Sequence, residues 1–349
     1  MDRRKTRSVK LADTYLGSNH PILIQSMTYT KTSDKEATLS QILALENAGC
    51  DIVRFSVPDE DCASSIPYLK EHSHIPLVAD IHFNHKLALE SLAAGVDKIR
   101  INPGNIGADE NVKAVAEACA LRGVPIRIGV NSGSVEKEIL AKYGAPTPDA
   151  MAESAMYHVK LLQKYDFDDI VISIKSSNVR NMIAAYRKVA SICDYPLHLG
   201  VTESGTERMG LIKSSVGIGS LLCDGIGDTI RVSLTDSPVK EVYAGFDILK
   251  SVDLDNSTPK LVSCPTCGRT KIDLIGLANE VEEKLRNVKK SITVAVMGCV
   301  VNGPGEAKEA DIGIAGGDGC AVIFKKGEIL RKVPEEDILE ELLKEIEKI

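Results

Sequence analysis

Eight short segments rich in Ile and Val alternate with helical segments over about the first 250 residues, and this alternation predicts an α/β fold, a (β/α)8 TIM barrel, followed by a smaller domain. The first strand segment begins at Pro21 and the eighth at Thr229, so one repeat is about 30 residues long, as expected for a βα unit. An open doubly wound sheet is the alternative, but no Gly-rich dinucleotide fingerprint follows the first strand. We therefore expect parallel strands joined by right-handed crossovers.

The predicted barrel begins with a hairpin over residues 9–16 that closes its bottom. Its strands are expected at 21–27, 51–57, 76–81, 98–102, 125–131, 169–175, 197–202 and 229–235. Between them apolar residues recur at helical spacing, as at Thr38, Ile42 and Leu45, and several helices end at a glycine such as Gly49. The fifth unit is longer than the others, which predicts an extra turn or helix near 134–143.

The pattern changes after about residue 245. A polar, turn-prone stretch at 253–258 predicts a linker between a substrate-binding barrel at 1–252 and a second domain at 259–349. We expect this second domain to contain a helix near 273–287, a buried strand at 293–297, strands near 311–315 and 321–324, and a C-terminal helix from 335.

Composition excludes several classes of protein. A formal net charge of −7, no Trp and only 4% aromatic residues argue against a general nucleic-acid binder. The longest apolar run is about eight residues, far short of the roughly 20 that a membrane helix needs. The basic N-terminus leads into no apolar segment, so we expect a solvated arm rather than a secretion signal. Nine cysteines are spread over 349 residues and do not form the dense pattern of a disulfide-rich secreted protein. This spacing indicates a protein of the reducing cytoplasm.

Five cations lie in predicted strands, four of them arginines set between apolar residues: Arg54, Arg100, Arg127, Arg231 and Lys175. A buried unpaired arginine is very costly, so each must meet an anion or a carboxylate. Guanidinium groups match phosphate oxygens, and the carboxyl ends of barrel strands converge on one mouth. This pattern predicts a phosphorylated or diphosphate substrate there. Internal ion pairs with Asp80, Glu203 and Asp236 are the alternative.

Other polar side chains come at or just beyond the strand ends: Asp80, Asn102, Asn131, Ser173, Thr202, Glu203 and Ser233. Asn and Ser at such places hydrogen-bond hydroxyl or phosphate oxygens, although single residues of these types are often turn formers. Glu203 is a candidate for proton transfer, and its alternative role is an ion pair with Arg231. His82, His85 and His198 show no carboxylate–histidine ligand pattern for zinc, and His85 is expected to be structural.

The second domain contains the sequence Cys264-Pro-Thr-Cys267, followed by Cys299 and, across a Gly-Pro-Gly turn, by Glu306. Structural zinc usually takes four Cys or His ligands, and the chain has no histidine after residue 198. A thioredoxin-like pair would not need Cys299. An iron–sulfur cluster with these three cysteines and Glu306 as a labile fourth ligand fits best.

The remaining cysteines carry no such pattern. Cys320 is a possible fourth ligand, but its surroundings are more typical of a turn entering a buried strand. The other five stand singly in the barrel and are expected in its core: Cys50, Cys62, Cys119, Cys193 and Cys223.

Taken together, the motifs of both domains closely resemble those of the IspG (GcpE) family over essentially the whole chain. The matching stretches begin at Gln25 (QSMT), Val53 (VRFSVP), Ala79 (ADIHF), Arg100 (RINPGN), Arg127 (RIGVNSGS), Gly200 (GVTESG), Cys264 (CPTCGR) and Gly298 (GCVVNGPGE). About a dozen residues separate the last barrel helix from Cys264, so the chain resembles the shorter, two-domain form of the family.

The resemblance implies an iron–sulfur oxidoreductase of the non-mevalonate isoprenoid pathway. Its substrate would be 2-C-methyl-D-erythritol 2,4-cyclodiphosphate, converted to (E)-4-hydroxy-3-methylbut-2-enyl diphosphate by two one-electron reductions with loss of water. The second domain would resemble a sulfite/nitrite reductase module with a [4Fe-4S] cluster. Ferredoxin or flavodoxin would donate the electrons, and a head-to-tail homodimer would bring each cluster to the partner's barrel.

The resemblance also implies residue roles. The cluster ligands would be Cys264, Cys267, Cys299 and Glu306. The diphosphate would bind to Arg54, Arg100, Arg127, Lys175 and Arg231, assisted by Asn131, Thr202 and Ser233. The reacting end would contact Asp80, Asn102 and Glu203, with Glu203 favoured for proton transfer. The unique iron would bind a substrate oxygen after Glu306 moves away.

Two other classes of protein remain open from the residues alone. One is a different barrel enzyme, such as an aldolase or a phosphosugar isomerase, with a structural zinc module. The other is a non-enzymatic iron sensor or nucleic-acid binder, against which the acidic net charge argues.

Overall fold

The structure is a computed structural model that describes residues 2–349 apart from 256, 287 and 302–306. The chain divides into two compact units, Met1–Val252 and Asp253–Ile349. Each unit has its own sheet and its own hydrophobic core.

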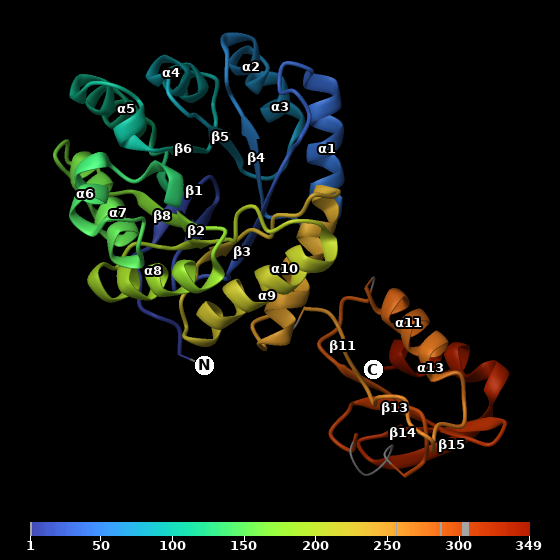
Figure 1. The fold of residues 1–349 in the computed structure, drawn as a ribbon. Helices are drawn as coiled ribbons and strands as arrows, with labels where there is room; N and C mark the ends of the chain where they lie inside the picture. Colours follow the sequence, from blue (N-terminus) through green and yellow to red (C-terminus); the bar gives the residue numbers. More distant parts are fainter. Residues whose placement is uncertain (1, 256, 287, 302–306) are drawn as a thin grey trace. The chain divides into compact units, whose positions relative to one another are not determined.

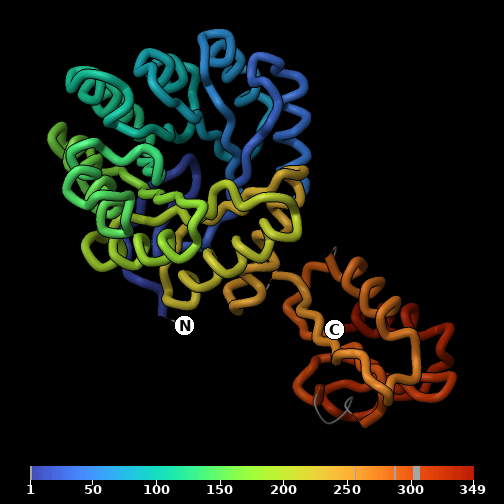
Figure 2. Tube along the Cα trace, in the orientation of Figure 1, coloured from blue at the N-terminus to red at the C-terminus, as the bar shows by residue number. Residues whose placement is uncertain are grey.

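The first unit is the predicted TIM barrel, whose described strands follow one another around the ring in sequence order. Strand β10 pairs in parallel with both β9 and β3, and a bridge from Ile172 of β8 to Leu197 closes the ring before β9. Figure 2 shows the colours following one another around this unit in the order of the chain. The strands are β3 (Leu23–Met27), β4 (Ile52–Ser56), β5 (Leu77–Asp80), β6 (Lys98–Ile101), β7 (Ile126–Asn131), β8 (Ile170–Lys175), β9 (His198–Leu199) and β10 (Thr229–Ile230).

The last two strands are shorter than the sequence predicts. Beyond β9 the chain turns, with positive φ angles of 52° at Glu203 and 100° at Gly205. Beyond β10 the backbone N–H of Leu234 donates to Glu241 and that of Thr235 to the carbonyl of Gly205, instead of to a neighbouring strand. Predicted residues such as Thr202 and Ser233 therefore lie on loops after the strands.

Helices surround the strand ring, as Figure 1 shows. The predicted extra helix of the fifth unit is α6, which follows a short 3₁₀ turn, η2 (Ser132–Ser134); a second turn of this kind, η1 (Pro103–Asn105), follows β6. The helices of the unit are α1 (Lys35–Asn47), α2 (Glu60–Ser64), α3 (Ile66–His72), α4 (His85–Ala93), α5 (Asp109–Arg122), α6 (Lys137–Tyr143), α7 (Pro148–Gln163), α8 (Val179–Ile192), α9 (Glu207–Cys223) and α10 (Pro238–Ser251).

The predicted hairpin closes the barrel from below. Strands β1 (Val9–Leu11) and β2 (Thr14–Leu16) pair antiparallel, and their apolar side chains form a buried cluster with Ile52, Val78 and Val171 of the barrel strands. The expectation of a solvated basic arm is wrong for the residues before this hairpin. Arg3 donates hydrogen bonds to the carbonyl oxygens of Gly17, Ser18, His20 and Gly227 and to the carboxylate of Asp228.

The second unit contains a five-stranded sheet in the order β11-β12-β13-β14-β15, parallel over the first three strands and antiparallel over the last two. Its elements are β11 (Lys260–Ser263), α11 (Leu274–Leu285), β12 (Thr293–Met297), β13 (Ile312–Gly317), β14 (Cys320–Lys325), β15 (Glu328–Pro334), η3 (Glu335–Asp337) and α13 (Ile338–Glu347). The sequence prediction missed β11 and β15 because both are edge strands with mostly exposed or half-buried residues, so neither is a continuous apolar run.

Within the described residues, no helix combines the length and the apolar character that crossing a bilayer requires.

Candidate functional site

Strand register brings the predicted cations together inside the barrel. Across β5, β6 and β7, Asp80 aligns with Arg100 and Arg100 aligns with Arg127. Side chains that align on neighbouring strands face the same side of a sheet. Arg54 of β4, Arg100, Arg127 and Lys175 at the end of β8 are all buried. The sequence pattern therefore identified a group of cations that share one interior.

Asp80 is the carboxylate that two of these cations share. The Nη1 atom of Arg100 donates to Oδ1 of Asp80 at 3.0 Å, and Nε of Arg54 lies 3.6 Å from Oδ2. Burial by itself would raise the pKa of Asp80, but the positive charges of Arg54, Arg100 and Arg127 outweigh it and hold this pKa well below its ordinary value. Asp80 is consequently an anion that orients guanidinium groups, as the ion-pair alternative foresaw for part of the cluster.

Two neighbours shape the positions of these arginines. Arg54 also points both Nε and Nη2 at the sulfur of Met27, at 3.1 and 2.8 Å. Gly129 of β7 lies directly under Arg100, because an added Cβ there would be 2.4 Å from Nε of Arg100. Glycine at 129 leaves the room that the guanidinium occupies.

Arg127 differs from the three other arginines of this group because no described residue forms a hydrogen bond with its guanidinium. Its side chain is 0% exposed, and its Nε, Nη1 and Nη2 atoms all lack a hydrogen-bond partner within the described residues. Burial, together with the charges of Arg54 and Arg100, lowers the pKa of Arg127 well below its usual value. A guanidinium in this state provides donors for an anion that the protein itself does not supply.

Lys175 adds to the same excess of positive charge. It is buried, and no ion pair joins it to a carboxylate of the described chain. Burial and then the charges of Arg54, Arg127 and Arg231 lower its pKa well below the ordinary value. Lys175 therefore also favours an anionic ligand in the barrel.

Arg231 has a carboxylate partner that the sequence analysis did not identify. Its Nη2 atom lies 3.4 Å from each carboxylate oxygen of Glu241, a buried residue of α10. Glu241 also accepts hydrogen bonds from Ser26 and from the backbone of Leu234. The alternative role of Glu203 as partner of Arg231 is thus not what the structure shows, and Asp236 pairs instead with Lys240. A buried glutamate on a helix carries no signal in the strand pattern.

The predicted neutral residues lie around the cations on the loops after the strands. Asn102 is buried, its Oδ1 accepts from the backbone N–H of Gly104 at 3.1 Å, and its Nδ2 has no partner among the described residues. Asn131 ends β7, and its backbone N–H donates to Ser134. Thr202 and Ser233 are half-buried. Ser173 instead donates to the carbonyl of Ile128 within the sheet, so it has a structural bond.

Glu203 is exposed and has a left-handed backbone with φ of 52°. A residue with a Cβ adopts this conformation at a cost, and such strain gathers at functional sites. The serine that follows anchors the loop, because the Ser204 hydroxyl donates to the carbonyl of Ser233. Glu203 and Ser233 are therefore connected through one loop contact.

Three further polar groups lie inside the barrel, and the sequence analysis assigned a role to none of them. Lys98 at the start of β6, His198 of β9 and Gln25 of β3 are each at most 1% exposed, and Lys98 Nζ, His198 Nε2 and both amide atoms of Gln25 lack partners in the described chain. Burial and then the charge of Arg127 lower the pKa values of both Lys98 and His198. In sequence these residues resemble ordinary strand positions, and only their burial identifies them.

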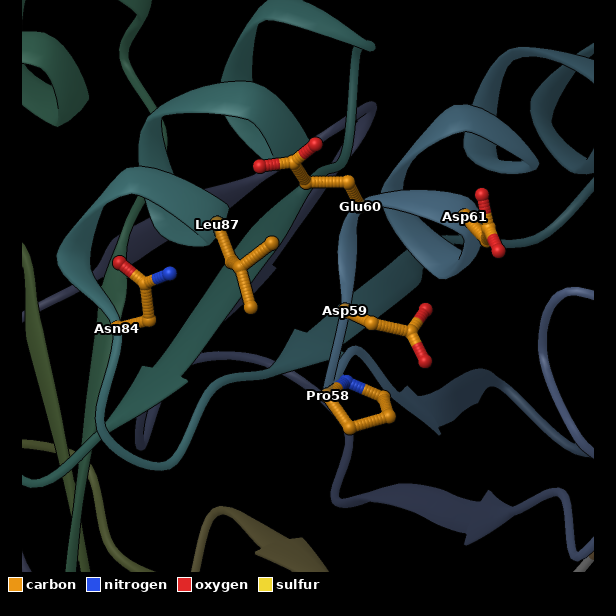
Figure 3. Close-up of a pocket in the computed structure, with 6 residues that line it drawn as sticks. All are labelled: Pro58, Asp59, Glu60, Asp61, Asn84 and Leu87. Atoms are coloured by element: carbon orange, nitrogen blue, oxygen red, sulfur yellow. The ribbon is translucent and has the colours of Figure 1, made fainter.

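A surface pocket of about 380 Å³ lies elsewhere, beside α2 and α4 (Figure 3). It is lined by Pro58, Asp59, Glu60, Asp61, Asn84 and Leu87, and Asp59 is already used as the N-cap of α2. Three carboxylates make this pocket unfavourable for an anion, in contrast to the group of cations inside the barrel.

In the second unit the predicted cluster residues follow two adjacent parallel strands. Cys264 comes directly after β11 and Cys299 two residues after β12, and the backbone N–H of Gly298 donates to the sulfur of Cys264 at 3.3 Å. Cys267 is exposed, and a backbone hydrogen bond from Arg269 lowers its pKa. Glu306 lies outside the described residues. Among the residues that are described, no three His, Cys, Asp or Glu side chains converge closely enough to hold a metal ion.

The prediction that the other barrel cysteines belong to the core is correct for three of them. Cys50, Cys62 and Cys119 are buried, whereas Cys193 is half-buried and Cys223 is exposed at the end of α9. Cys223 lies in the last turn of an outer helix, where an isolated cysteine carries no sign of its exposure. Cys320 begins β14, as its sequence suggested.

Comparison with known proteins identifies both units. Residues 6–246 match the family model of the GcpE TIM-barrel domain, and residues 260–348 match that of the GcpE protein C-terminal domain. Three curated relatives are each named 4-hydroxy-3-methylbut-2-en-1-yl diphosphate synthase (flavodoxin). The one from Fusobacterium nucleatum is 59% identical over 98% of this chain and 97% of its own. The one from Caldanaerobacter subterraneus is 61% identical over 99% and 98%. The one from Clostridium perfringens is 59% identical over 100% of both.

Solved structures agree on the barrel. A dihydropteroate synthase from Yersinia pestis covers 70% of this chain and 98% of its own with a TM-score of 0.52 and 11% identity. A type I 3-dehydroquinate dehydratase from Clostridium difficile covers 70% and 98% with a TM-score of 0.51 and 15% identity. At such low identity the likeness shows a shared fold alone.

Proposed function

Because this chain belongs to the GcpE family, we propose how its two units carry out the family's reaction, the reductive ring opening and dehydration of 2-C-methyl-D-erythritol 2,4-cyclodiphosphate to (E)-4-hydroxy-3-methylbut-2-enyl diphosphate in the non-mevalonate isoprenoid pathway. The reaction takes up two electrons and protons, breaks the ring bond from carbon to a phosphate oxygen, and releases one hydroxyl as water. The single observation that carries the proposal is Arg127, a fully buried guanidinium with no partner for any of its three nitrogens in the described chain.

In this proposal the cations bind the diphosphate. Arg127 and Lys175 provide free positive charge, while Arg54 and Arg100 are held in place by Asp80 and Arg231 by Glu241. A preoriented guanidinium loses less conformational entropy when it binds a phosphate. The hydroxyls of Thr202 and Ser233 and the amide of Asn131 then supply neutral hydrogen bonds. The site thus combines arginines that carboxylates hold in place before binding with cations and neutral groups that gain a partner only when the ligand binds.

The reacting end of the substrate faces groups that can donate or move a proton. The Nδ2 atom of Asn102 is buried and unpartnered, so it can donate to a substrate hydroxyl. Glu203 is the proton-transfer group in this proposal, and its strained loop holds the carboxylate in an exposed position where no described residue forms an ion pair with it. Asp80 stays ionised, because the nearby arginines hold its pKa well below the ordinary value. In this proposal it orients Arg54 and Arg100 near the reacting end of the substrate.

The second unit offers a donor set that fits an iron–sulfur cluster. Cys264, Cys267 and Cys299 would hold it, with Glu306 as the fourth ligand. The hydrogen bond from the Gly298 backbone to Cys264 Sγ stabilises a thiolate, the form in which cysteine binds iron. When bound, a [4Fe-4S] cluster supplies single electrons and an iron that an oxygen ligand can reach. The cysteines' part is to hold the cluster, and the carboxylate's part is to leave one position replaceable.

The central test is ligand binding by Arg127→Met, a substitution that keeps the volume and removes the charge. We expect the Kd for the cyclodiphosphate to rise by at least about a hundredfold, because a desolvated charge–phosphate contact is lost. Lys10→Met, on the exposed edge of the bottom hairpin, removes the same charge elsewhere and should leave the Kd unchanged. Equal affinity of Arg127→Met and the wild type would refute the anion site.

Iron and sulfide analysis with spectroscopy on oxygen-free protein, with and without the cyclodiphosphate, tests the cluster. Iron and sulfide near four of each per chain, and a spectrum that changes with substrate, are the expected result. A colourless protein that contains zinc would instead support a barrel enzyme with a structural zinc module.

The relatives' names support flavodoxin as the electron donor, and we propose it here. Reduced flavodoxin should sustain turnover at least as fast as reduced ferredoxin.

We also propose a cytoplasmic enzyme, which the free cysteines support.

A head-to-tail homodimer, in which each cluster unit serves the partner's barrel, is the assembly we propose. Mixing a Cys264→Ala chain with a Glu203→Ala chain should restore activity, since one site of each mixed dimer then has an intact barrel and an intact cluster. Chains that mix but recover no activity would contradict the exchange.

A further inference from the structure

A fully buried histidine lies behind two loops of the barrel mouth. His158 is on α7 and is 0% exposed. Its Nε2 atom is 2.6 Å from Oε1 of Glu136, a residue of the loop that follows β7. Buried imidazoles are usually satisfied core residues, so the question is what this one holds in place.

On one side the imidazole supports the turn after β6. An added Cβ at Gly104 would lie only 2.8 Å from Cε1 of His158, so this turn, η1, packs directly on the ring. The same turn fixes Asn102, whose Oδ1 accepts from the backbone N–H of Gly104. That bond leaves Nδ2 of Asn102 buried and available. The direction of Nδ2 thus depends on where the turn rests on His158.

On the other side the imidazole holds the loop after β7. This loop runs from Asn131 through the Ser134 turn to Glu136, and Ser134 bonds to the backbone of Asn131 at both its N–H and its carbonyl. Burial would raise the pKa of Glu136, but the interactions of its carboxylate with His158 and Ser154 outweigh burial and lower the pKa. Losing His158 would remove the nitrogen that lies 2.6 Å from this half-buried carboxylate, so the position of the loop is energetically coupled to the ring.

We propose that His158, through Glu136 and Gly104, is a positioning residue that ties the Asn102 turn to the Asn131 loop and sets the distance between their amides in the substrate site. The inference rests on the proposed roles of Asn102 and Asn131. His158 itself lies behind the loops and does not touch the substrate. Its effect is on geometry, and a displacement of about 1 Å in a substrate-contacting group can change a rate by up to about a hundredfold.

The test compares His158→Phe with Leu162→Ala in the cluster-loaded enzyme. Leu162 is also fully buried on α7 and its side chain is apolar, so its truncation removes packing and leaves the His158–Glu136 contact in place. We expect His158→Phe to raise KM and the Kd of the cyclodiphosphate about tenfold and to lower kcat. Leu162→Ala should lower Tm while the folded fraction keeps wild-type KM and kcat.

Rescue and coupling separate positioning from packing. His158→Gln keeps an N–H donor for Glu136 and should recover part of the lost affinity, and Glu136→Gln should reproduce the KM increase from the other side of the contact. In a double-mutant cycle, His158→Phe should cost less in the Asn102→Ala background than in the wild type, because part of its effect acts through the Asn102 amide. Additive effects, or a His158→Phe enzyme with the kinetics of Leu162→Ala, would overturn the proposal.

Failure of the proposed function has a different signature. If the wild-type enzyme neither binds nor turns over the cyclodiphosphate, the substrate is wrong. If the wild type is active and only the His158 comparison fails, the positioning role alone is wrong. If His158→Phe does not fold, the positioning role is tested with Glu136→Gln alone and in a double-mutant cycle with Asn102→Ala.

Discussion

Arg3 and Arg127 are both held by the barrel, and their surroundings are opposite. Arg3, below the barrel, donates to four backbone carbonyl oxygens and the carboxylate of Asp228. Arg127, inside it, is more deeply buried and donates to no group of the described chain. An arginine whose donors are all used stabilises the fold, whereas one whose donors are all free costs stability until a ligand arrives. The bottom of the barrel is thus complete by itself, and its interior is not.

The strongest test of this comparison is to remove the charge of Arg3 and that of Arg127 in separate variants and to measure the free energy of unfolding without ligand. Arg3→Met should lower the free energy of unfolding by about 2–3 kcal/mol, because four partly buried carbonyls lose a donor and Asp228 loses its Arg3 ion pair. Arg127→Met should raise it by about 1–3 kcal/mol, because it removes an uncompensated buried charge. Denaturant titration measures both. A loss of stability in Arg127→Met would mean that the guanidinium has a partner in the free protein.

Asp80 offers an effect of similar size to that of Arg3, since it neutralises two of the interior cations. Asp80→Asn should cost about 3 kcal/mol in the ligand-free protein, by leaving Arg54 and Arg100 without their carboxylate. The cyclodiphosphate should then raise Tm more in this variant than in the wild type. A smaller ligand-induced shift in the variant would contradict the idea that anion and carboxylate compensate the same charges.

The difference in stability between the wild type and Asp80→Asn has a pH dependence that follows from the depressed pKa of Asp80. Its folded pKa is below the unfolded value, so its contribution is present above about pH 4 and is lost only as the pH falls toward the folded pKa. The stability gap between wild type and Asp80→Asn should therefore be equal at pH 7 and pH 5. A gap that closes between those values would show that Asp80 titrates normally.

Lys98 gives a smaller effect of opposite sign. Lys98→Met should stabilise the free protein by about 1–2 kcal/mol, since it removes a fully buried, unpartnered ammonium. Burial lowers the folded pKa of Lys98 below the unfolded one, so between the two values the unfolded state binds more protons and wild-type stability rises with pH. The advantage of Lys98→Met should shrink as the pH approaches 10. A constant advantage from pH 6 to 10 would contradict this.

The smallest expected effect concerns Arg7, the exposed counterpart of Arg3. Arg7 pairs with Asp194 and Asp168, and its side chain is 32% exposed. Arg7→Gln should cost at most about 1 kcal/mol, and 0.5 M salt should remove most of that, since surface ion pairs are screened. A salt-independent loss would place Arg7 with Arg3 among the structural arginines.

The same contrast explains which features sequence reasoning could predict. The barrel follows from the βα repeat, and the apolar–Arg–apolar pattern of the strands identified the buried cations, because an arginine inside a strand is unusual. Glu241 was missed because a glutamate on a helix is ordinary until packing buries it. Lys98 and His198 received no role in the sequence analysis, because their complete burial becomes apparent only in the structure.

Prediction from the local sequence pattern also failed where the backbone departs from a regular strand. Strands β9 and β10 were predicted too long because Val201, Val232 and Leu234 continue the apolar alternation of the strands, yet the segments that contain them leave the sheet, and the backbone of Leu234 bonds to Glu241 instead. The cluster ligands remain a prediction from motif spacing and family membership. Glu306 stands in a segment outside the described residues.

The close approach of Gly129 to Arg100 has a consequence for how this barrel can evolve. A methyl group at 129 and a guanidinium at 100 would occupy the same volume, since the added carbon would be 2.6 Å from Nη2 and 2.4 Å from Nε. Alanine at 129 is therefore compatible only with a displaced guanidinium or a shorter side chain at 100, whereas a shorter side chain at 100 is compatible with glycine at 129. During evolution a change at position 129 is thus conditional on a change or displacement at position 100, and the reverse dependence does not hold.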